Sequence, residues 1–247
     1  PNCYKNNILE KCKVCALPIE TEYINDHWGN SYHKKHTEYL PFCESCNRII
    51  SKGITNGGYE INGERNVCFL CWNSIVTNKS NIPAIYRDVA LKLKNIGINL
   101  PNKIPITLVN TRADLKKISK IRLGSIQGYT KYEVETLGDR IVSEDYNIYI
   151  LSHLHEINFR AVLAHELLHV YLFKNRLNLP SNLTEGFCNL GSQLIYKEDI
   201  GKISDLKLKA MYEDSDPIYG KGFIKMNKIL NNRGWDGVIK FLQQKSQ

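Results

Sequence analysis

One short segment in the second half of the chain holds residues suited to metal chemistry. His165, Glu166 and His169 form an HExxH motif within an apolar stretch. On a helix, residues four apart lie on nearly the same face, so both imidazoles can reach one metal ion while Glu166 faces a water beside it. A bound dication also compensates the cost of burying these three polar groups. The motif predicts a zinc site that activates water for amide hydrolysis, with Glu166 as the general base.

A catalytic zinc site needs a third protein ligand and an open coordination position. Our candidate is Glu185, which follows Pro180 near the start of the next predicted helix. A helical hairpin would bring its carboxylate back over the metal, and Gly186 would let a neighbouring backbone approach closely. The alternative is an exposed glutamate in a first helical turn, where the helix dipole favours negative charge.

Other side chains could complete the predicted site. A hydrolytic site needs a donor for the developing oxyanion, and Tyr219, His153 and His155 are available. The alternatives are an ordinary core aromatic for the tyrosine and ordinary loop residues for the histidines. We also expect Asn189, one helical turn beyond Glu185, to orient a metal ligand.

A second set of chemistry-bearing residues fills the start of the chain. Seven of the eight cysteines precede Trp72, and six of these form three CxxC pairs. A HxxH pair lies between the first two of them, so eight ligands predict two tetrahedral zinc ions that replace a hydrophobic core. The first ion is assigned to Cys12, Cys15, His33 and His36, and the second to Cys43, Cys46, Cys68 and Cys71.

A disulfide framework is the alternative for this cysteine-rich segment. It is less favoured, because disulfide frameworks rarely repeat CxxC so regularly or place a HxxH at the matching interval. Two cysteines remain outside the pairs. We predict that Cys3 is a spare thiol near the chain end, and that Cys188 is a buried, inert residue on the apolar side of a helix.

The elements that position these residues fall into two predicted domains, 1–78 and 79–247, because cysteine almost vanishes after the third pair. A small sheet precedes several helices in the second domain, which gives an α+β fold. We also expect an extended substrate to pair along the edge of the strand Asn147–Leu151. The predicted strands are Ile104–Asn110 and Asn147–Leu151, with a strand-and-turn region at Tyr129–Ile141, and the predicted helices are Tyr86–Ile96, 159–174, 183–197, 220–230 and 235–244.

The amino-acid composition of the chain indicates a globular protein. The chain has 247 residues and a formal net charge of +8, with 43% hydrophobic and 23% charged residues, which is ordinary for a globular protein. The longest apolar stretch is interrupted by the HExxH residues, so no membrane span is expected. The first residues, Pro1 to Glu10, lack the apolar core of a signal peptide, and a processed or trimmed start is expected. We expect a soluble, cytoplasmic protein with no membrane partner.

Nine basic residues between Arg87 and Arg122 face only two acidic ones. Such a run favours either a solvated surface or an acidic partner. Nucleic-acid binding is disfavoured, because aromatic stacking platforms are not interleaved with the basic residues.

Taken together, the motifs resemble the DA-one family of LIM-containing zinc peptidases, over about Lys11 to Phe241. The three CxxC hooks are similar to that family's LIM-like module, including a six-residue gap between His36 and Cys43 where an ordinary LIM domain has two. The segment Ala164 to His169 is similar to its active helix, with leucines where methionines are common. The segment Glu185 to Cys188 is similar to its third-ligand segment, although Thr184 replaces one of two adjacent glutamates.

The resemblance continues through Lys103 to Val109, which is similar to the strand at the head of the family's peptidase domain. It also includes Asp216 to Phe223, which favours Tyr219 as a catalytic residue over the two histidines. The fold it implies is a LIM-like two-zinc module followed by a zincin-like peptidase domain. Ubiquitin regulation, known for plant members with upstream ubiquitin-interacting motifs, is not carried over, because this sequence contains no such segment.

The predicted function is a zinc metallopeptidase that acts on protein substrates and uses one catalytic and two structural zinc ions. The LIM-like module would bind a protein partner or support the catalytic domain. The alternative is a non-catalytic zinc-binding adaptor, against which the intact Glu166 argues.

Overall fold

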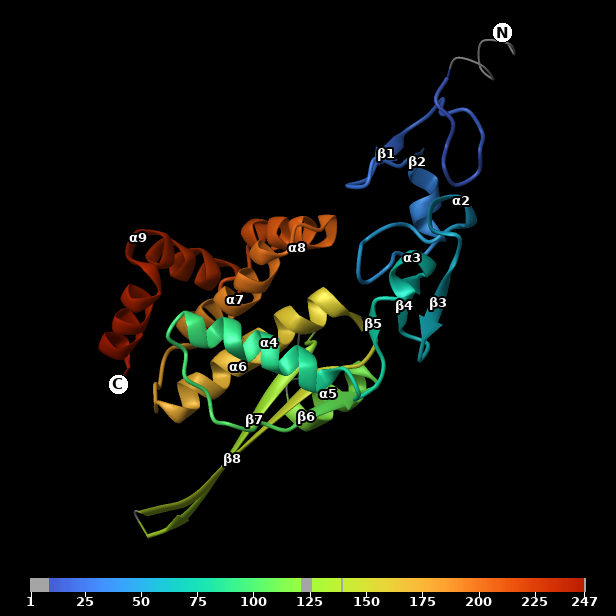
Figure 1. Ribbon diagram of the computed structural model, residues 1–247. Coiled ribbons are helices and arrows are strands. Elements are labelled where there is room, and N and C mark those ends of the chain that lie inside the picture. The colour runs from blue at the N-terminus through green and yellow to red at the C-terminus, as the bar shows by residue number, and fades with distance from the viewer. Residues whose placement is uncertain (1–8, 121–125, 139, 247) are drawn as a thin grey trace. The chain divides into compact units, whose positions relative to one another are not determined.

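The computed structural model describes residues 9–120, 126–138 and 140–246, so Cys3, Arg122 and Asp139 lie outside the described part. The chain divides into two compact units, Pro1–Ile75 and Val76–Gln247 (Figure 1). This division lies three residues before the predicted boundary at residue 78.

The first unit is built around two equivalent cysteine hooks. Isolated bridges, Lys11 with Pro18 and Phe42 with Ile49, bracket the first and second CxxC pairs. In both hooks the residue after the second cysteine adopts a left-handed backbone, with φ 61° at Ala16 and 57° at Asn47. Each of these residues donates its amide to the carbonyl of the first cysteine at 2.8 Å. Two CxxC segments far apart in sequence thus fold into the same turn.

Short hairpins follow the hooks. β1 (Tyr23–Asn25) pairs antiparallel with β2 (Ser31–His33), and β3 (Gly58–Ile61) pairs antiparallel with β4 (Arg65–Cys68). The helical segments η1 (Lys34–Glu38), α2 (Lys52–Thr55) and α3 (Phe69–Trp72) are each five residues or shorter. Apart from cysteines, the described residues of this unit bury only four hydrophobic side chains, Tyr32, Ile49, Ile61 and Val67. So little buried apolar area calls for additional stabilisation, such as a bound metal.

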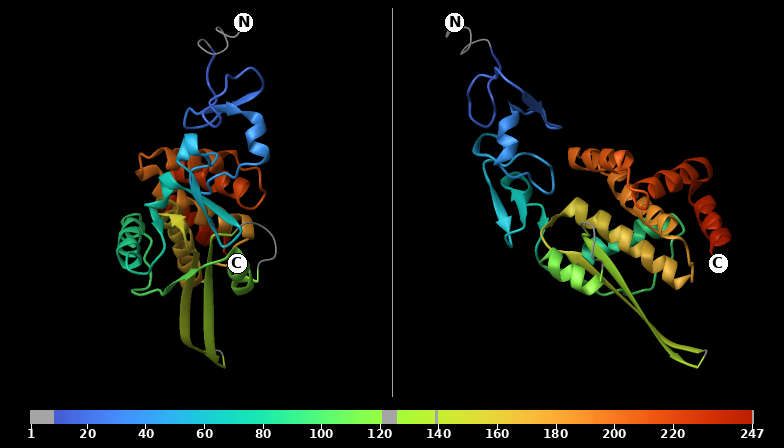
Figure 2. Two further views of the ribbon diagram at one scale, coloured as in Figure 1. Left: turned by 90° about the vertical axis from the view of Figure 1, so that its right-hand side faces the viewer. Right: turned by 180° about the vertical axis from the view of Figure 1, so that it is seen from behind.

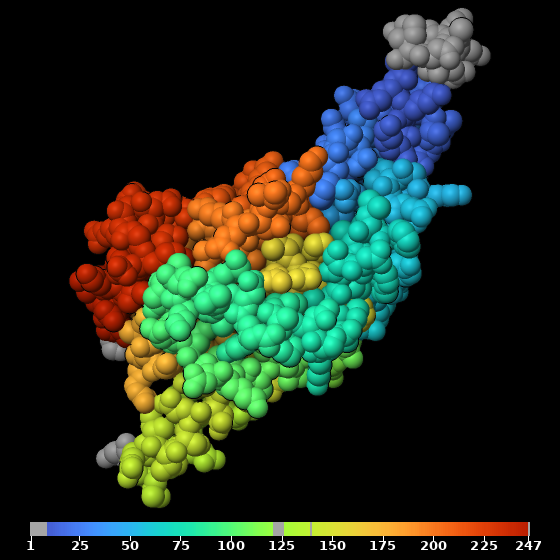
Figure 3. Space-filling view, in the orientation of Figure 1, coloured from blue at the N-terminus to red at the C-terminus, as the bar shows by residue number. Residues whose placement is uncertain are grey.

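The second unit contains a three-stranded sheet of order β6-β8-β7. β6 (Ile106–Val109) runs parallel to β8 (Arg140–Leu151), and β7 (Gly128–Leu137) runs antiparallel to it. The predicted strand at residues 147–151 is therefore central, and the expectation that a substrate pairs along its edge is wrong. Both of its edges are occupied, and the edge strands of the described sheet are β6 and β7. Figure 2 shows the far ends of β7 and β8 projecting from the body of this unit as a two-stranded arm, and in Figure 3 the same yellow-green segment protrudes from the unit.

Helices cover the sheet and complete the second unit. Central among them is α6 (Glu156–Lys174), which packs on β7, on α4 (Ile82–Asn95) and on α7 (Ser181–Glu198). In turn, α9 (Gly220–Lys245) packs against α7. The helical conformation of α9 is interrupted at Gly234, with φ 65°, near the gap predicted between the helices 220–230 and 235–244. The sequence did not predict α5 (Arg112–Ser119) or α8 (Lys202–Glu213). The short strands β5 (Ile75–Val76) and β9 (Leu154–His155) pair with each other.

The fold is mixed, with a large buried core in the second unit that includes most of the apolar side of α6. Among the helices of the described residues, none has the length and apolar character that crossing a membrane requires.

Candidate metal centres and the cleft beside α6

Helix α6 carries both histidines of the HExxH motif on one face. Apolar residues fill its remaining sides, so the helix is buried on nearly all sides and its polar groups are held in place by packing. The side chains of His165 and His169 are about one-sixth exposed, and Glu166 is 5% exposed. Their ring nitrogens, Nε2 of each, lie 3.2 Å apart.

Glu185, on the next helix α7, completes a three-residue group with the two histidines. Its Oε2 atom lies 3.3 Å from His165 Nε2 and 3.7 Å from His169 Nε2. Two nitrogen or oxygen ligands bound tetrahedrally to one zinc ion, each at about 2.1 Å, lie about 3.4 Å apart. All three separations match this value, so the donor set fits a zinc ion.

Cys188 offers a second candidate for the third ligand. Its thiol lies within 4.8 Å of the two imidazole nitrogens, which sequence analysis did not anticipate for a residue expected to be inert. Burial, together with the charges of Glu185 and Glu166, raises the pKa of the Cys188 thiol well above its usual value. For Glu185, burial acts to raise the pKa, but hydrogen bonds with His165 and His169 overcome it and lower the pKa to about 2. The carboxylate is the better candidate, because its distances to both imidazoles match those of ligands on one zinc ion and its low pKa keeps it ionised.

Asn189 lies behind His165. Its side-chain oxygen is 3.0 Å from His165 Nδ1, so that nitrogen donates a hydrogen bond to the amide and Nε2 is left to face Glu185. The amide nitrogen of Asn189 donates to the backbone carbonyl of Tyr219 at 3.3 Å. One side chain on α7 thus orients a candidate ligand and ties the start of α9 to the site.

Strand β7, at one edge of the sheet, contacts Glu166 through Thr130. Thr130 Oγ1 lies 2.7 Å from the carboxylate Oε2 of Glu166 and 3.0 Å from its backbone carbonyl. Two residues earlier, a Cβ atom at Gly128 would lie 2.5 Å from Glu166 Oε1, so only glycine fits beside the carboxylate. Neither residue is predictable from local sequence, because their closeness to the HExxH motif depends on the pairing of β7 with β8.

These residues line one cleft of about 960 Å³ in the second unit. Its walls come from β7, α6, α7 and α8, with Met211 on α8 and Phe173 on α6 adding apolar surface. Tyr219 also lines the cleft, and burial, followed by the charges of Glu185 and Glu166, raises its pKa to about 12. The Tyr219 hydroxyl therefore stays protonated and can donate a hydrogen bond.

The structure does not bring the other two candidate donors to the cleft. His155 caps the N-terminus of α6, where its Nδ1 accepts from the Ile157 amide at 3.4 Å. Ten residues of helix separate it from His165, which corresponds to about 15 Å. His153 interacts with Ser152 at 2.8 Å in the turn before β9. Neither belongs to the described lining of the cleft.

The first cluster in the Pro1–Ile75 unit joins the hook at Cys12 and Cys15 to the HxxH pair. Cys15 Sγ lies 3.5 Å from His33 Nδ1, close to the separation of about 3.6 Å expected for a sulfur and a nitrogen on one zinc ion. His33 directs its other ring nitrogen to the Pro18 carbonyl at 3.1 Å, which fixes the ring as in many metal sites. Among the described residues, His36 Nε2 is buried with no hydrogen-bond partner, as expected of a metal ligand.

The second cluster consists of four buried cysteines, Cys43, Cys46, Cys68 and Cys71, whose sulfurs all lie within 4.8 Å of one another. Cys46 Sγ and Cys68 Sγ are 3.7 Å apart, against about 3.8 Å expected for two thiolates on one zinc ion. The Cys68 amide donates to Cys43 Sγ at 3.3 Å, and hydrogen bonds from its neighbours, Cys46 first, lower the pKa of Cys43. All seven described cysteines are free thiols, in contrast to the disulfide alternative.

The three Cys and His clusters are therefore compatible with bound metal ions such as zinc. Comparisons of the chain with protein-family models, with curated proteins and with solved structures found no match.

Proposed function

We propose that this protein is a zinc-dependent peptidase that hydrolyses peptide bonds in protein substrates. The observation that carries the proposal is the convergence of His165, His169 and Glu185 within 3.7 Å of one another, beside the buried Glu166 and in a large cleft. Three protein ligands leave a fourth tetrahedral position for water or substrate, which is the arrangement of a catalytic site.

A bound zinc ion would lower the pKa of a water and polarise the substrate carbonyl. Glu166 would accept the proton of that water and pass it to the leaving nitrogen. The Thr130 hydroxyl donates to the Glu166 carboxylate and holds it in one orientation for both transfers. Tyr219 also lines the cleft, and its protonated hydroxyl would donate to the oxyanion that develops on the substrate.

Strand β7 is suited to bind the substrate backbone. It is one of the two edge strands of the described sheet, and its first residues, Gly128 to Thr130, line the cleft. An extended peptide can add to such an edge through main-chain hydrogen bonds that do not depend on side-chain identity. This favours a peptide substrate over a small amide.

We further propose that the first unit is a LIM-like module with two structural zinc ions that supports the enzyme or binds a partner. Its eight ligands supply the stability that its small core lacks. Tyr59 and Phe69 are 39% and 43% exposed, and the Tyr59 ring packs against Trp72 in a tilted arrangement, with ring centroids 4.0 Å apart. Exposed aromatic residues of this kind are enriched in protein interfaces.

The test compares wild type with Glu166→Gln for the appearance of new peptide termini in a proteome digest and for cleavage of a substrate found there. Gln keeps the size of Glu166 but cannot accept a proton, so we expect a loss of about 10²-fold or more in kcat with the zinc content retained. Retained zinc shows that the site is intact in the variant.

Two results would count against a peptidase. Unchanged proteolysis in Glu166→Gln would show that the activity arises elsewhere. Wild-type protein that holds the third ion but yields no new termini would favour the adaptor alternative.

A further inference from the structure

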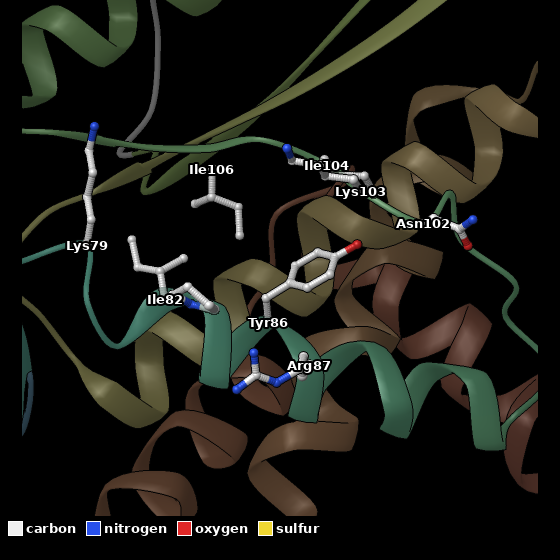
Figure 4. A pocket seen from close by; sticks show the side chains of 9 residues that line it. Lys79, Ile82, Tyr86, Arg87, Asn102, Lys103, Ile104 and Ile106 are labelled. Carbon is white, nitrogen blue, oxygen red and sulfur yellow. The ribbon is translucent and has the colours of Figure 1, made fainter.

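A second hollow lies in the Val76–Gln247 unit, away from the cleft. It has a volume of about 410 Å³ and lies between the first turns of α4 and the segment that leads into β6 (Figure 4). It shares no described lining residue with the cleft that holds Glu166. The proposed peptidase chemistry therefore gives it no role.

The floor of this hollow is apolar. Ile82 and Ile104 are 6% and 5% exposed and belong to the core of the unit, and the partly buried Ile106 packs against them. Figure 4 shows Ile82 and Ile106 facing each other, with the Tyr86 ring reaching from α4 toward the segment that carries Ile104. Burial raises the pKa of Tyr86, so its hydroxyl is a neutral donor at the wall. The hollow is large enough for an apolar side chain.

The rim of the hollow is basic. Lys79, Arg87 and Lys103 line it, and no described lining residue is acidic. None of the three forms an ion pair with a described residue, whereas neighbouring charges on α4 do, since Asp88 pairs with Arg160. Three unpaired cations around one hollow repel each other in the absence of an anion. Their placement is therefore favourable for binding an acidic ligand.

The form of that ligand follows from where the charges lie. Figure 4 shows the charged ends of Lys79, Arg87 and Lys103 at separate points around the apolar floor, not converging on one spot. A compact phosphate would need convergent cations, and a nucleic acid would need stacked aromatic platforms, of which the described lining offers only Tyr86. An extended chain with several carboxylates and an apolar side chain between them matches both features.

We propose that this hollow binds an acidic peptide segment of a partner protein. One apolar side chain of the segment enters the space between Ile82 and Ile106, and flanking carboxylates pair with Lys79, Arg87 and Lys103. The interaction gives a function to Arg87 and Lys103, two members of the basic run between Arg87 and Arg122. The charge pattern alone did not decide whether that run is a solvated surface or binds an acidic partner.

The test uses a short fluorescent peptide in which glutamates flank a central leucine, with binding to the protein followed by anisotropy. Two matched peptides carry glutamine in place of glutamate, or serine in place of leucine. Because both the rim and the floor contribute, each replacement should weaken binding by about tenfold. The double variant Lys79→Glu with Lys103→Glu should show a similar loss, with zinc content and peptidase activity unchanged.

The matched control is Lys94→Glu with Lys228→Glu, two exposed lysines outside the hollow that give the same change in net charge. It should bind the peptide within about twofold of wild type. Equal losses in both double variants would overturn the proposal in favour of non-specific attraction. Tighter binding of an unrelated single-stranded oligonucleotide, or displacement of the peptide by inorganic phosphate, would overturn it in favour of a nucleic acid or a small anion.

Discussion

At the scale of single residues, substitution of Thr130 tests whether its hydroxyl positions the proposed general base, Glu166. We expect Thr130→Val, which keeps the shape but removes the hydroxyl bonded to Glu166, to lower kcat by about 10- to 100-fold, because a hydrogen bond to a charged group contributes about 1.5–3 kcal/mol. KM should change little, since Thr130 acts through Glu166. Steady-state kinetics on one peptide substrate measures both values.

The control for this prediction is Thr130→Ser, which restores the hydroxyl and should recover most of the activity. Zinc content and the thermal midpoint of both variants exclude a general loss of structure. Equal activity of the valine and serine variants would show that the contact with Glu166 is only structural.

The identity of the third ligand is a second question at this scale. We expect Glu185→Gln to lose the metal of the cleft, whereas Cys188→Ser should retain it, because the Glu185 carboxylate lies within 3.7 Å of both imidazoles and is the ionised group of the two. Elemental analysis of zinc per chain after dialysis measures the difference. The reverse pattern would assign the thiol as the ligand.

Sequence alone could indicate the ligands but not their positioning partners. His165 and His169 are one helical turn apart, and the two cysteines of each hook are three residues apart, so local geometry brings each pair together. Thr130 lies 36 residues from Glu166, and the register of β7 on β8 decides that they meet. No local pattern around Thr130 marks it as a site residue.

At the scale of elements, the cleft depends on how closely the helices pack. A Cβ atom at Gly186 on α7 would lie 2.4 Å from the backbone of Gly222 on α9, so the two helices cross where neither has a side chain. We expect Gly186→Ala to push the helices apart and lower the free energy of unfolding by about 1–3 kcal/mol. Because Gly186 adjoins Glu185, zinc affinity should fall as well. Denaturant titration and competition with a zinc dye measure the two effects.

A matched control on the same helix is Lys197→Ala, an exposed position that should change stability by less than about 0.5 kcal/mol. A Gly186→Ala variant with unchanged stability and zinc affinity would mean that α7 and α9 can separate without moving Glu185.

The prediction of elements succeeded where a strong apolar pattern exists and failed where it does not. α6 and α7 carry many buried residues, and their predicted ranges overlap the observed ones. α8 was missed, and its apolar pattern is weak, because Ser204 is its only buried residue and Leu208 and Met211 are only partly buried against the core. The wrong edge assignment for residues 147–151 has a different cause, since the position of a strand within a sheet depends on its neighbours and not on its own sequence.

At the scale of the whole molecule, the metal content distinguishes the three clusters. We expect roughly three zinc ions per chain, because each set of ligands fits one ion. A mild chelator should remove one of them first and abolish activity, since that site opens into the cleft while most ligands of the other two clusters are buried. Zinc analysis and activity followed over time with the chelator test this order. A content near two would leave only the structural ions and contradict the peptidase proposal.

Acidification should unfold the two units at different pH values, because different interactions stabilise them. Zinc binds deprotonated cysteine and neutral histidine, so protons compete for all eight ligands of the first unit, and its stability is present at neutral pH and lost as pH falls. The second unit has a large apolar core that does not depend on metal. We therefore expect loss of backbone amide protection in residues 9–75 before residues 76–246, measured by hydrogen exchange at decreasing pH. Added zinc should shift the first transition to lower pH, and simultaneous loss in both units at every zinc concentration would contradict a metal-stabilised first unit.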